Sequence, residues 1–407
     1  MADILFVAHR VPWPPDKGDK IRACNIIRHL ASRGHRVHLA AFVDDPADLE
    51  RADELDRWCA SKHLARIDRM TKWRRMAGAL ASGKALSVAV FDDATLRRWI
   101  EARIAAGIDL AIGYSGAVAP LFDFTPHVFD LVDCDSAKWQ AMARGRGGPL
   151  GWIFRREARL VAELEKRIVR RAEATLLVSE PEAELCRSIT APGGGPAGNR
   201  IHAVANGVDT ELFDPHREWP RPYPADGRPA IIFTGVMNYA PNAEAVQWFH
   251  RHVWPQLRRH GTRPRLAIVG SSPTAAIRAL ATGDDILVTG RVADVQPWLA
   301  HAAVAVAPLQ LARGIQNKVL EAMAMERPVV ATSAAAEGID ALPGDHFFIA
   351  DEPDLFAQTV TDLLDRPDHA TATGKAARAR VIETHSWQAR LAPIDDILTQ
   401  VIANRAA

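Results

Sequence analysis

Short runs of apolar residues alternate with longer amphipathic segments along the whole chain. Runs that are rich in β-branched residues predict buried strands, and amphipathic segments predict the helices that cover a sheet. In the first half the pattern predicts strands at 4–8, 37–42, 109–113, 128–132, 175–178 and 201–204. In the second half it predicts strands at 231–234, 266–269, 286–289, 304–307, 329–331 and 347–350. The predicted fold class is therefore α/β, with parallel sheets between layers of helices.

A proline-rich segment separates the two halves of this pattern. Residues 214–229 contain five prolines, which oppose both a helix and a central strand. We predict an N-terminal Rossmann-like domain over 1–213, a linker over 214–229, and a C-terminal Rossmann-like domain over 230–385. Apolar residues at helical spacing predict a last helix within 386–407. Two such doubly wound domains are expected to face each other across a cleft, with ligands beyond the carboxyl ends of their strands.

The composition is that of a globular chain with room for more than one hydrophobic core. Of its 407 residues 48% are hydrophobic, and 50 Lys and Arg nearly balance 49 Asp and Glu. This balance provides no basic field for nucleic acid, so no nucleic-acid partner is expected. No apolar run approaches the roughly 18 residues that span a bilayer, and residues 4–8 are too short for a signal peptide. The four cysteines are scattered singly, so we expect a reduced, cytoplasmic protein without a zinc site.

Two glycine-rich segments resemble nucleotide-binding motifs without meeting their structural requirements. Residues 193–198 satisfy the dinucleotide fingerprint, but they follow a predicted helix and precede a strand, which reverses the required order. Residues 78–84 resemble a phosphate-binding loop, but Ala85 stands where a Ser or Thr would hold magnesium. We interpret the first segment as a loop and the second as the end of a helix.

Two carboxylates, Asp133 and Asp135, follow the predicted strand at 128–132. Such a pair could hold a divalent ion that bridges the diphosphate of a nucleotide sugar, as in metal-dependent sugar transferases with a single nucleotide domain. An aspartate at the end of a strand can equally cap the next helix or turn. The two-domain layout favours a site without metal.

The segment from Gly314 to Glu321 carries the strongest signal of a binding site. It follows the strand at 304–307 and opens a helix, so a flexible glycine, free amides and Lys318 lie where a phosphate would bind. Glu321 lies about one turn further on, where it can accept hydrogen bonds from a ribose diol. The alternative is a surface ion pair of Lys318 with Glu321, but residues 322–325 are small and apolar, as in a buried helix. The predicted donor-binding residues of this segment are Gly314, Ile315, Gln316, Asn317, Lys318 and Glu321.

Four segments resemble motifs of the glycosyltransferase family 4 group of the GT-B superfamily, and the resemblance covers essentially the whole chain. They are the Asn-Gly-Val-Asp turn at 206–209, the strand and glycine turn at 233–242 that includes Gly235, the loop at 288–299 that includes Arg291, and the Glu-Ala-Met-Ala signature at 318–330. The resemblance implies two Rossmann-like domains in the GT-B arrangement. It also implies that the helix at 386–407 packs back on the first domain; the alternative is an ordinary helix of the second domain.

The N-terminal segment 10–22, with residues 84–88 and 114–115, is more specifically similar to the sugar transferases of bacterial PEP-CTERM and exosortase exopolysaccharide systems. Here a first strand is followed by a loop with Gly18 and then a helix, so its amides could face the same diphosphate. The alternative for this loop is a proline-stiffened turn before a solvated basic helix.

The chain departs from the family pattern at two places. Arg313 stands where the family has the first of two glutamates spaced eight positions apart, and Val236 and Asn238 stand where the family tends to have Arg and Lys. A diphosphate leaving group still has to be neutralised, so we expect Lys318, with Arg313 or Arg291, to supply the positive charge.

The resemblance implies a retaining, metal-independent transfer of a sugar from a nucleotide-sugar donor to a hydroxyl of a glycan or lipid-linked acceptor. The second domain would bind the nucleotide and the first the acceptor, with no cofactor. Lys318 would act on the phosphates, and Asp133 or Asp135 would stabilise charge on the sugar. The alternatives are an epimerase-like nucleotide-sugar enzyme, for which His9 is the obvious histidine, and a catalytically silent nucleotide-binding protein.

Two basic stretches are relevant to a lipid-linked acceptor, because they resemble segments that contact a membrane. Residues 66–76 mix basic and apolar residues as an interfacial helix does, and residues 155–171 carry seven basic residues against three glutamates. They indicate peripheral contact with the inner face of a membrane. The alternative is that both stretches are ordinary solvated helix faces.

Overall fold

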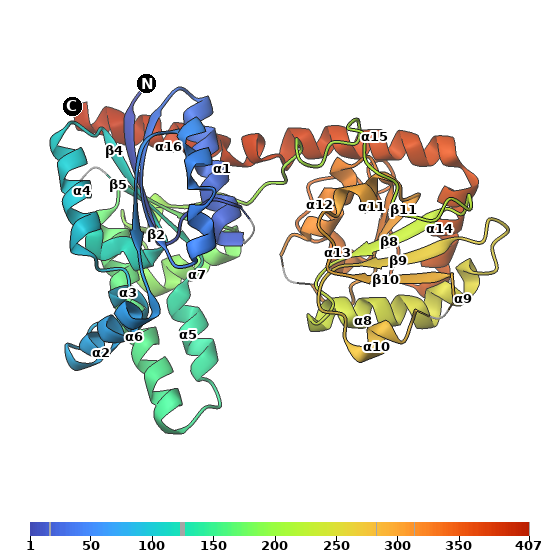
Figure 1. Ribbon diagram of the computed structural model, residues 1–407, viewed down its shortest axis with the longest axis horizontal. Coiled ribbons are helices and arrows are strands. Elements are labelled where there is room, and N and C mark those ends of the chain that lie inside the picture. Colours follow the sequence, from blue (N-terminus) through green and yellow to red (C-terminus); the bar gives the residue numbers. More distant parts are fainter. Residues whose placement is uncertain (16–17, 123–126, 282, 313, 407) are drawn as a thin grey trace. The chain divides into compact units, whose positions relative to one another are not determined.

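A computed structural model describes residues 1–407 except 16–17, 123–126, 282, 313 and 407 (Figure 1). The chain divides into two compact units. The first contains Met1–Asn206 together with Arg390–Ala407, and the second contains Gly207–Ala389. Each unit is a parallel sheet with helices on both of its faces (Figure 1). The predicted α/β class and its doubly wound sheets are confirmed.

The first unit has a seven-stranded parallel sheet in the order β3-β2-β1-β4-β5-β6-β7. Its strands are β1 (Asp3–Ala8), β2 (Arg36–Val43), β3 (Cys59–Arg66), β4 (Leu110–Tyr114), β5 (His127–Val132), β6 (Ala174–Leu177) and β7 (Ile201–Ala203). Its helices are α1 (Gly18–Ser32), α2 (Arg69–Ala81), α3 (Leu86–Ala89), α4 (Ala94–Ala105), α5 (Asp135–Ala143), α6 (Gly148–Arg171) and α7 (Glu180–Thr190). Short 3-10 turns lie at η1 (Pro46–Leu49), η2 (Ala52–Arg57), η3 (Gly116–Leu121) and η4 (Gly198–Arg200).

The central strands of this sheet are buried on both faces because helices cover both. β1 lies between β2 and β4, with Ile4 opposite Val37 on one side and Leu110 on the other. Strand β3 was not predicted. It is an edge strand with polar, half-exposed residues at its centre, so it has no continuous apolar run.

The second unit has a six-stranded parallel sheet in the order β10-β9-β8-β11-β12-β13. Its strands are β8 (Ala230–Thr234), β9 (Arg265–Val269), β10 (Ile286–Gly290), β11 (Val304–Ala307), β12 (Val329–Ala331) and β13 (Phe348–Ile349). Its helices are α8 (Ala240–Trp248), the π-helical η5 (Phe249–Val253), α9 (Trp254–Leu257), α10 (Ala275–Arg278), α11 (Gln296–Ala300), α12 (Asn317–Ala324), α13 (Ser333–Ala336), α14 (Pro353–Asp365) and α15 (Pro367–Thr384).

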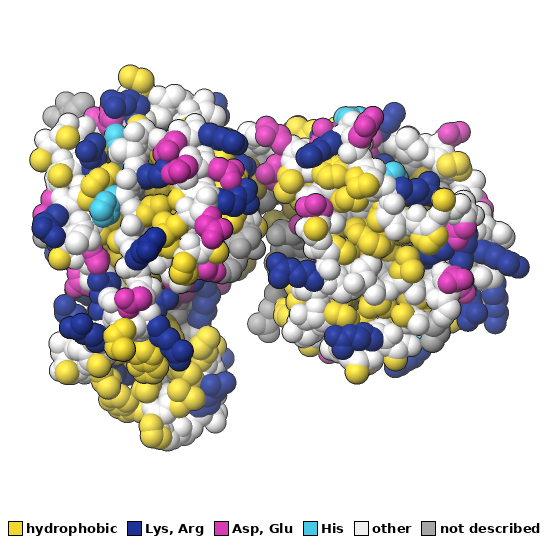
Figure 2. Space-filling model, viewed as in Figure 1, with side chains coloured by type: hydrophobic (Ala, Val, Ile, Leu, Met, Phe, Trp, Pro, Cys, Tyr) yellow, Lys and Arg dark blue, Asp and Glu magenta, His cyan; other side chains and the backbone are white. Residues whose placement is uncertain are grey.

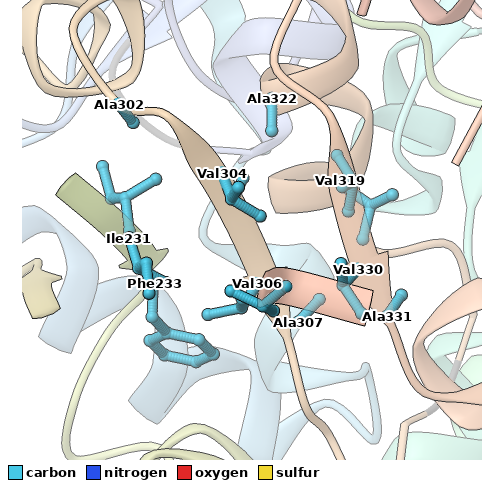
Figure 3. Packing of buried hydrophobic residues seen from close by; sticks show 14 of the residues in the cluster. Ile231, Phe233, Ala302, Val304, Val306, Ala307, Val319, Ala322, Val330 and Ala331 are labelled. Carbon is cyan, nitrogen blue, oxygen red and sulfur yellow. The ribbon is translucent and has the colours of Figure 1, made fainter. Parts of the chain in front are cut away.

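The core of the second unit joins α12 to the middle of its sheet. Figure 3 shows Val319 and Ala322 of the helix beside Val304 and Val330 of the strands. All four side chains are buried. Burial of such side chains stabilises the unit by roughly 1.5–3 kcal/mol for each larger residue, so α12 is held firmly against the sheet.

The proline-rich segment 214–229 packs on the second unit. The Tyr223 side chain is buried, and its hydroxyl donates a hydrogen bond to the carbonyl of Trp298 at 2.8 Å. The Trp219 indole donates to the carbonyl of Asp214 at 2.8 Å. Proline keeps this segment out of the sheet, but its aromatic side chains still contribute to the core.

The last helix, α16 (Trp387–Ala406), belongs to the first unit from Arg390 onward. The Asp395 carboxylate lies 2.8 Å from Nε2 of His29 and 2.8 Å from Nη2 of Arg33, near the end of α1. Among the helices that the structure describes, none is long and apolar enough to cross a membrane.

Candidate functional site

The switch point of the second sheet lies at β8, which pairs with β9 on one side and β11 on the other. In doubly wound sheets, ligands bind beyond the carboxyl ends of the strands at such a point. There Gly235 follows β8, and the chain after β11 leads to α12, which begins at Asn317. The site is therefore built on the turn after β8 and on the start of α12.

The turn after β8 is fixed by a close approach of two backbone segments. The Gly235 amide donates to the carbonyl of Val269 at 3.0 Å, and the Met237 amide donates to the carbonyl of Ser271 at 2.8 Å. A Cβ atom at Gly270 would lie 1.8 Å from the Gly235 carbonyl oxygen, and the φ of Gly270 is +148°. Only glycine fits there. Because Gly270 has no side chain, the two backbone segments can approach closely enough to form the hydrogen bonds that fix the turn after β8.

Lys318 points toward this turn. Its Nζ donates a hydrogen bond to Oδ1 of Asn242 at 2.5 Å and lies 4.7 Å from the centroid of the Phe233 ring. The Asn242 amide nitrogen donates in turn to the carbonyl of Val236 at 3.0 Å. Burial lowers the pKa of Lys318 to about 8, although the nearby carboxylate of Glu321 favours the charged form. A partly buried cation is thus aimed at the carboxyl end of β8.

Glu321 lies one turn along α12 from Lys318. Burial raises the pKa of its carboxyl group to about 7, and the charge of Lys318 partly opposes that rise. Among the described residues, the Glu321 carboxylate makes no hydrogen bond or ion pair. Lys318 and Glu321 are therefore not a surface ion pair, and the carboxylate is free to accept hydrogen bonds from a ligand.

The first turn of α12 offers backbone amides. Gln316 is the N-cap residue, but its side chain makes no capping hydrogen bond and donates instead to the carbonyl of Gly314 at 2.9 Å. Gly314 is exposed and has a φ of +68°, while Ile315 packs beside Gly338. The amides of Asn317 and Lys318 at this helix end favour an anion.

The other donor-binding residues predicted in the second unit differ in how near they lie to Lys318 and Asn242. Gly235 adjoins Asn242, because a Cβ atom at Gly235 would lie 2.7 Å from the Asn242 amide nitrogen. Arg291 is exposed just after β10, which is separated from β8 by β9. Arg313 lies outside the described residues.

In the first unit, Gly18 is the first residue of α1, and Asp19 follows it. The Asp19 carboxylate lies 3.4 Å from Nε2 of His9 and accepts a hydrogen bond from Nη1 of Arg10 at 2.6 Å. The hydrogen bond with His9 and the charge of Arg10 hold the pKa of Asp19 well below its usual range, against the effect of burial. The start of α1 is thereby tied to the end of β1.

Asp133 and Asp135 lie where β5 ends and α5 begins, and both pair with one lysine. Nζ of Lys138 lies 2.7 Å from Oδ2 of Asp133 and 3.3 Å from Oδ1 of Asp135. In the parts of the chain that the structure describes, no three His, Cys, Asp or Glu side chains are grouped to hold a metal ion. The carboxylate pair itself is partly exposed and accessible to a ligand.

Sequence reasoning missed a buried polar cluster in the same unit. Nε of Arg22 donates to Oδ2 of Asp130 at 2.9 Å, and its Nη1 donates to Oδ1 of Asn206 at 2.9 Å. Asp130 also accepts from the amide of Val132, whose φ of +67° is rare for a β-branched residue. The signal for this cluster was an aspartate inside an apolar strand. Its effect is to shape the end of β5 just before Asp133.

Comparison with known proteins gives a family match within the second unit. Residues 228–366 match the family model described as "Glycosyl transferases group 1", and the matched segment contains Asn242, Lys318 and Glu321. The alpha-maltose-1-phosphate synthase of Mycolicibacterium smegmatis is 28% identical over 304 residues, which cover 68% of this chain and 73% of that protein.

Solved structures resemble the chain over nearly its whole length. The sucrose-phosphate synthase of Thermosynechococcus elongatus has a TM-score of 0.61 at 18% identity, with 99% of this chain and 100% of the other covered. HepE of Anabaena, solved in complex with UDP-glucose, has a TM-score of 0.56 at 14% identity, with 100% of both chains covered. The fold is therefore GT-B. The family match and the similarity to the maltose-1-phosphate synthase support glycosyltransferase activity.

Proposed function

We propose that this protein is a retaining, metal-independent glycosyltransferase that moves a sugar from a nucleotide-sugar donor to a hydroxyl acceptor. The observation that carries the proposal is the Asn242–Lys318–Glu321 arrangement at the switch point of the second sheet. Lys318 and the α12 amides would bind the diphosphate, and Glu321 would accept hydrogen bonds from the ribose diol. One short helix would thus bind both the diphosphate and the ribose of the donor.

Transfer breaks the bond between the anomeric carbon and the diphosphate oxygen and forms a bond from that carbon to the acceptor oxygen. Negative charge collects on the departing diphosphate, where protonated Lys318 and the helix amides stabilise it. The acceptor hydroxyl would pass its proton to the departing diphosphate oxygen as the new bond forms, so that the products are the glycoside and the nucleoside diphosphate. Asp133 or Asp135 of the first unit would stabilise the positive charge that develops on the sugar.

The comparisons and the sequence support a choice of donor and acceptor to test. HepE of Anabaena was solved with UDP and with UDP-glucose, so uridine diphosphate sugars are the first donors to test. The similarity of the N-terminal segment to exopolysaccharide transferases suggests a glycan or lipid-linked acceptor. The proposed role is therefore the synthesis of an exopolysaccharide or another envelope glycan.

A thermal-shift panel of nucleoside diphosphates and nucleotide sugars tests donor binding. A ligand that binds only the folded chain raises its melting temperature, and we expect a selective rise with one base. Lys318→Ala should reduce that rise strongly, whereas Lys375→Ala, an exposed lysine of α15, should preserve it. A wild-type chain that responds to no nucleotide, or a Lys318→Ala chain that responds like wild type, would contradict the proposal.

The chemistry needs its own measurement once the donor is known. Turnover in the presence of EDTA should equal turnover without it if no metal takes part. The anomeric configuration of the product, read from proton NMR couplings, should match that of the donor. Loss of activity with EDTA, restored by a divalent ion, would refute the metal-independent mechanism, and an inverted product would refute retention.

A further inference from the structure

Large apolar side chains are exposed on two segments of the first unit. One segment is α2, and the other is the connected end of the α5–α6 hairpin. Trp73 of α2 is 61% exposed, and Trp152 of α6 is 53% exposed. The exposed apolar residues of these two segments are Met70, Trp73, Leu80, Met142, Leu150 and Trp152.

The two segments are joined through Arg156 and Glu157 of α6, which form a buried ion pair with each other. Nη2 of Arg156 donates to the carbonyl of Ala79 at 3.2 Å and to the carbonyl of Lys84 at 2.7 Å, which joins α6 to the end of α2. Its neighbour Glu157 accepts hydrogen bonds from the amides of Leu86 and Ser87 at the start of α3. Trp152 is one turn of α6 from Arg156, so it lies near the end of α2.

The hairpin itself is a rigid support. α5 and α6 pack along each other, and the rings of Trp139 and Phe154 lie 5.7 Å apart across the hairpin. Nη1 of Arg155 donates to the carbonyl of Arg146 at 3.1 Å and fixes the connection between the helices. The exposed apolar residues thus lie on fixed helices and not on a loose loop.

The charged residues within these two segments are all basic, although acidic residues outside them pair with some, Asp93 with Arg75 and Asp44 with Lys72. Neither 69–81 nor 142–156 contains an acidic residue. Exposed arginines flank the apolar side chains in both segments, namely Arg69, Arg74, Arg144, Arg146 and Arg155. Figure 2 shows hydrophobic and basic side chains gathered on α2 and the hairpin, in the lower part of the first unit.

We propose that α2 and the connected end of the α5–α6 hairpin form one docking surface for an anionic lipid bilayer. Trp, Met and Leu side chains would enter the boundary between headgroups and acyl chains, and the arginines would attract anionic headgroups. A second copy of the chain is a poor occupant because it would place like charges opposite each other. The inference deepens the proposed function, since it names the partner of the acceptor-side unit.

Co-sedimentation of the full chain with vesicles tests this surface. We expect binding to vesicles of phosphatidylcholine mixed with phosphatidylglycerol at low salt, weak binding to phosphatidylcholine alone, and release as salt screens the arginines. Trp73→Ser and Trp152→Ser should each weaken binding by about tenfold, because each removes one inserted aromatic side chain. Arg74→Glu with Arg146→Glu should weaken it further than either tryptophan substitution.

Matched controls lie on the second unit. Leu355→Ser and Ile382→Ser replace apolar residues that are 50% and 45% exposed, and Arg251→Glu with Arg259→Glu makes the same change of net charge. These variants should bind the mixed vesicles like wild type. All substituted residues are exposed, and unchanged circular dichroism and melting temperature would show that each variant is folded.

Three outcomes would overturn the proposal: equal binding to neutral and anionic vesicles, wild-type binding by both tryptophan variants, or a chain that dimerises in solution and becomes monomeric in those variants. Vesicle binding needs no nucleotide, so its result is separate from that of the thermal-shift panel. A chain that binds anionic vesicles and responds to no nucleotide would retain this surface and lose the proposed activity.

Discussion

The ammonium group of Lys318 donates its hydrogen bond to the side chain of Asn242, which lies 76 positions earlier in the chain. Asn242 is buried at the start of α8, and its amide also holds the turn after β8 through the carbonyl of Val236. Asn242 therefore links the Lys318 ammonium of α12 to the backbone that follows β8. It determines where the positive charge of Lys318 is placed.

We predict that Asn242→Ala weakens nucleotide-sugar binding by about fivefold, because loss of one hydrogen bond leaves Lys318 less well positioned, a change of about 1 kcal/mol. Asn242→Asp should weaken binding more, since its carboxylate pairs with Lys318 and competes with the diphosphate. Titration calorimetry of the two variants measures both effects. Asn199→Ala, an exposed asparagine of the first unit, is the control and should bind like wild type. Stronger binding by the Asp variant than by the Ala variant would contradict this role.

The low pKa of Lys318, about 8, predicts a pH dependence of donor binding. A diphosphate favours the protonated lysine, so affinity should fall as the pH rises through about 8; it should also fall below about pH 7, where the Glu321 carboxylate takes up a proton. The bound diphosphate raises the lysine pKa, so binding at pH 8–9 should take up a proton. A nucleotide sugar is the suitable probe because it has no terminal phosphate with a second pKa near 6.

Calorimetry in buffers with different ionisation enthalpies measures this proton uptake directly. In Lys318→Ala the alkaline fall and the uptake should both disappear, and affinity below pH 8 should drop about 10- to 100-fold. In Asn242→Asp the fall should move to higher pH, because the new carboxylate stabilises the ammonium. An unchanged alkaline limb in Lys318→Ala would assign the titration to another group.

The sheets were predictable because their signal is local. All twelve predicted strands are present within a few residues, since central strands of a doubly wound sheet are continuous apolar runs. β3 was missed because an edge strand needs no such run. The position of Lys318 at a helix start was also readable from the glycine and the apolar residues after it.

The partners of the candidate site were not predictable in the same way. Asn242 stands in the motif that resembles the family, but its hydrogen bond to Lys318 depends on the packing of two elements far apart in sequence. The buried Arg22–Asp130 pair likewise joins residues 108 positions apart. Tertiary packing decides such pairs: a local pattern can single out Asp130 inside its apolar strand, but it does not indicate which residue will be its partner.

Because the Glu321 carboxylate has no hydrogen-bond partner among the described residues, its substitution should weaken the binding of some ligands and not of others. Glu321→Gln should weaken binding of a ribonucleotide about tenfold, because a charged acceptor of the ribose diol is lost. The same substitution should leave binding of the 2′,3′-dideoxy analogue nearly unchanged, since that ligand lacks both hydroxyls. Calorimetry with the two ligands and the two proteins gives a double-mutant cycle. Equal losses for both ligands would place Glu321 away from the ribose.

The close approach of Gly270 to Gly235 gives a prediction about stability. A Cβ atom in Gly270→Ala would lie 1.8 Å from the Gly235 carbonyl oxygen, at a φ of +148°, so the backbones must separate. We expect a loss of about 2–4 kcal/mol and a melting temperature about 5–10 °C lower. Gly261→Ala is the matched control, because a Cβ atom there meets nothing within 4 Å, and it should change stability by less than about 0.5 kcal/mol.

Since the separation of the two backbones also displaces the turn that Asn242 holds, donor affinity should fall in Gly270→Ala even well below its melting temperature. Equal melting temperatures for the two alanine variants would show that the turn after β8 can move freely, and that Lys318 is not positioned by it.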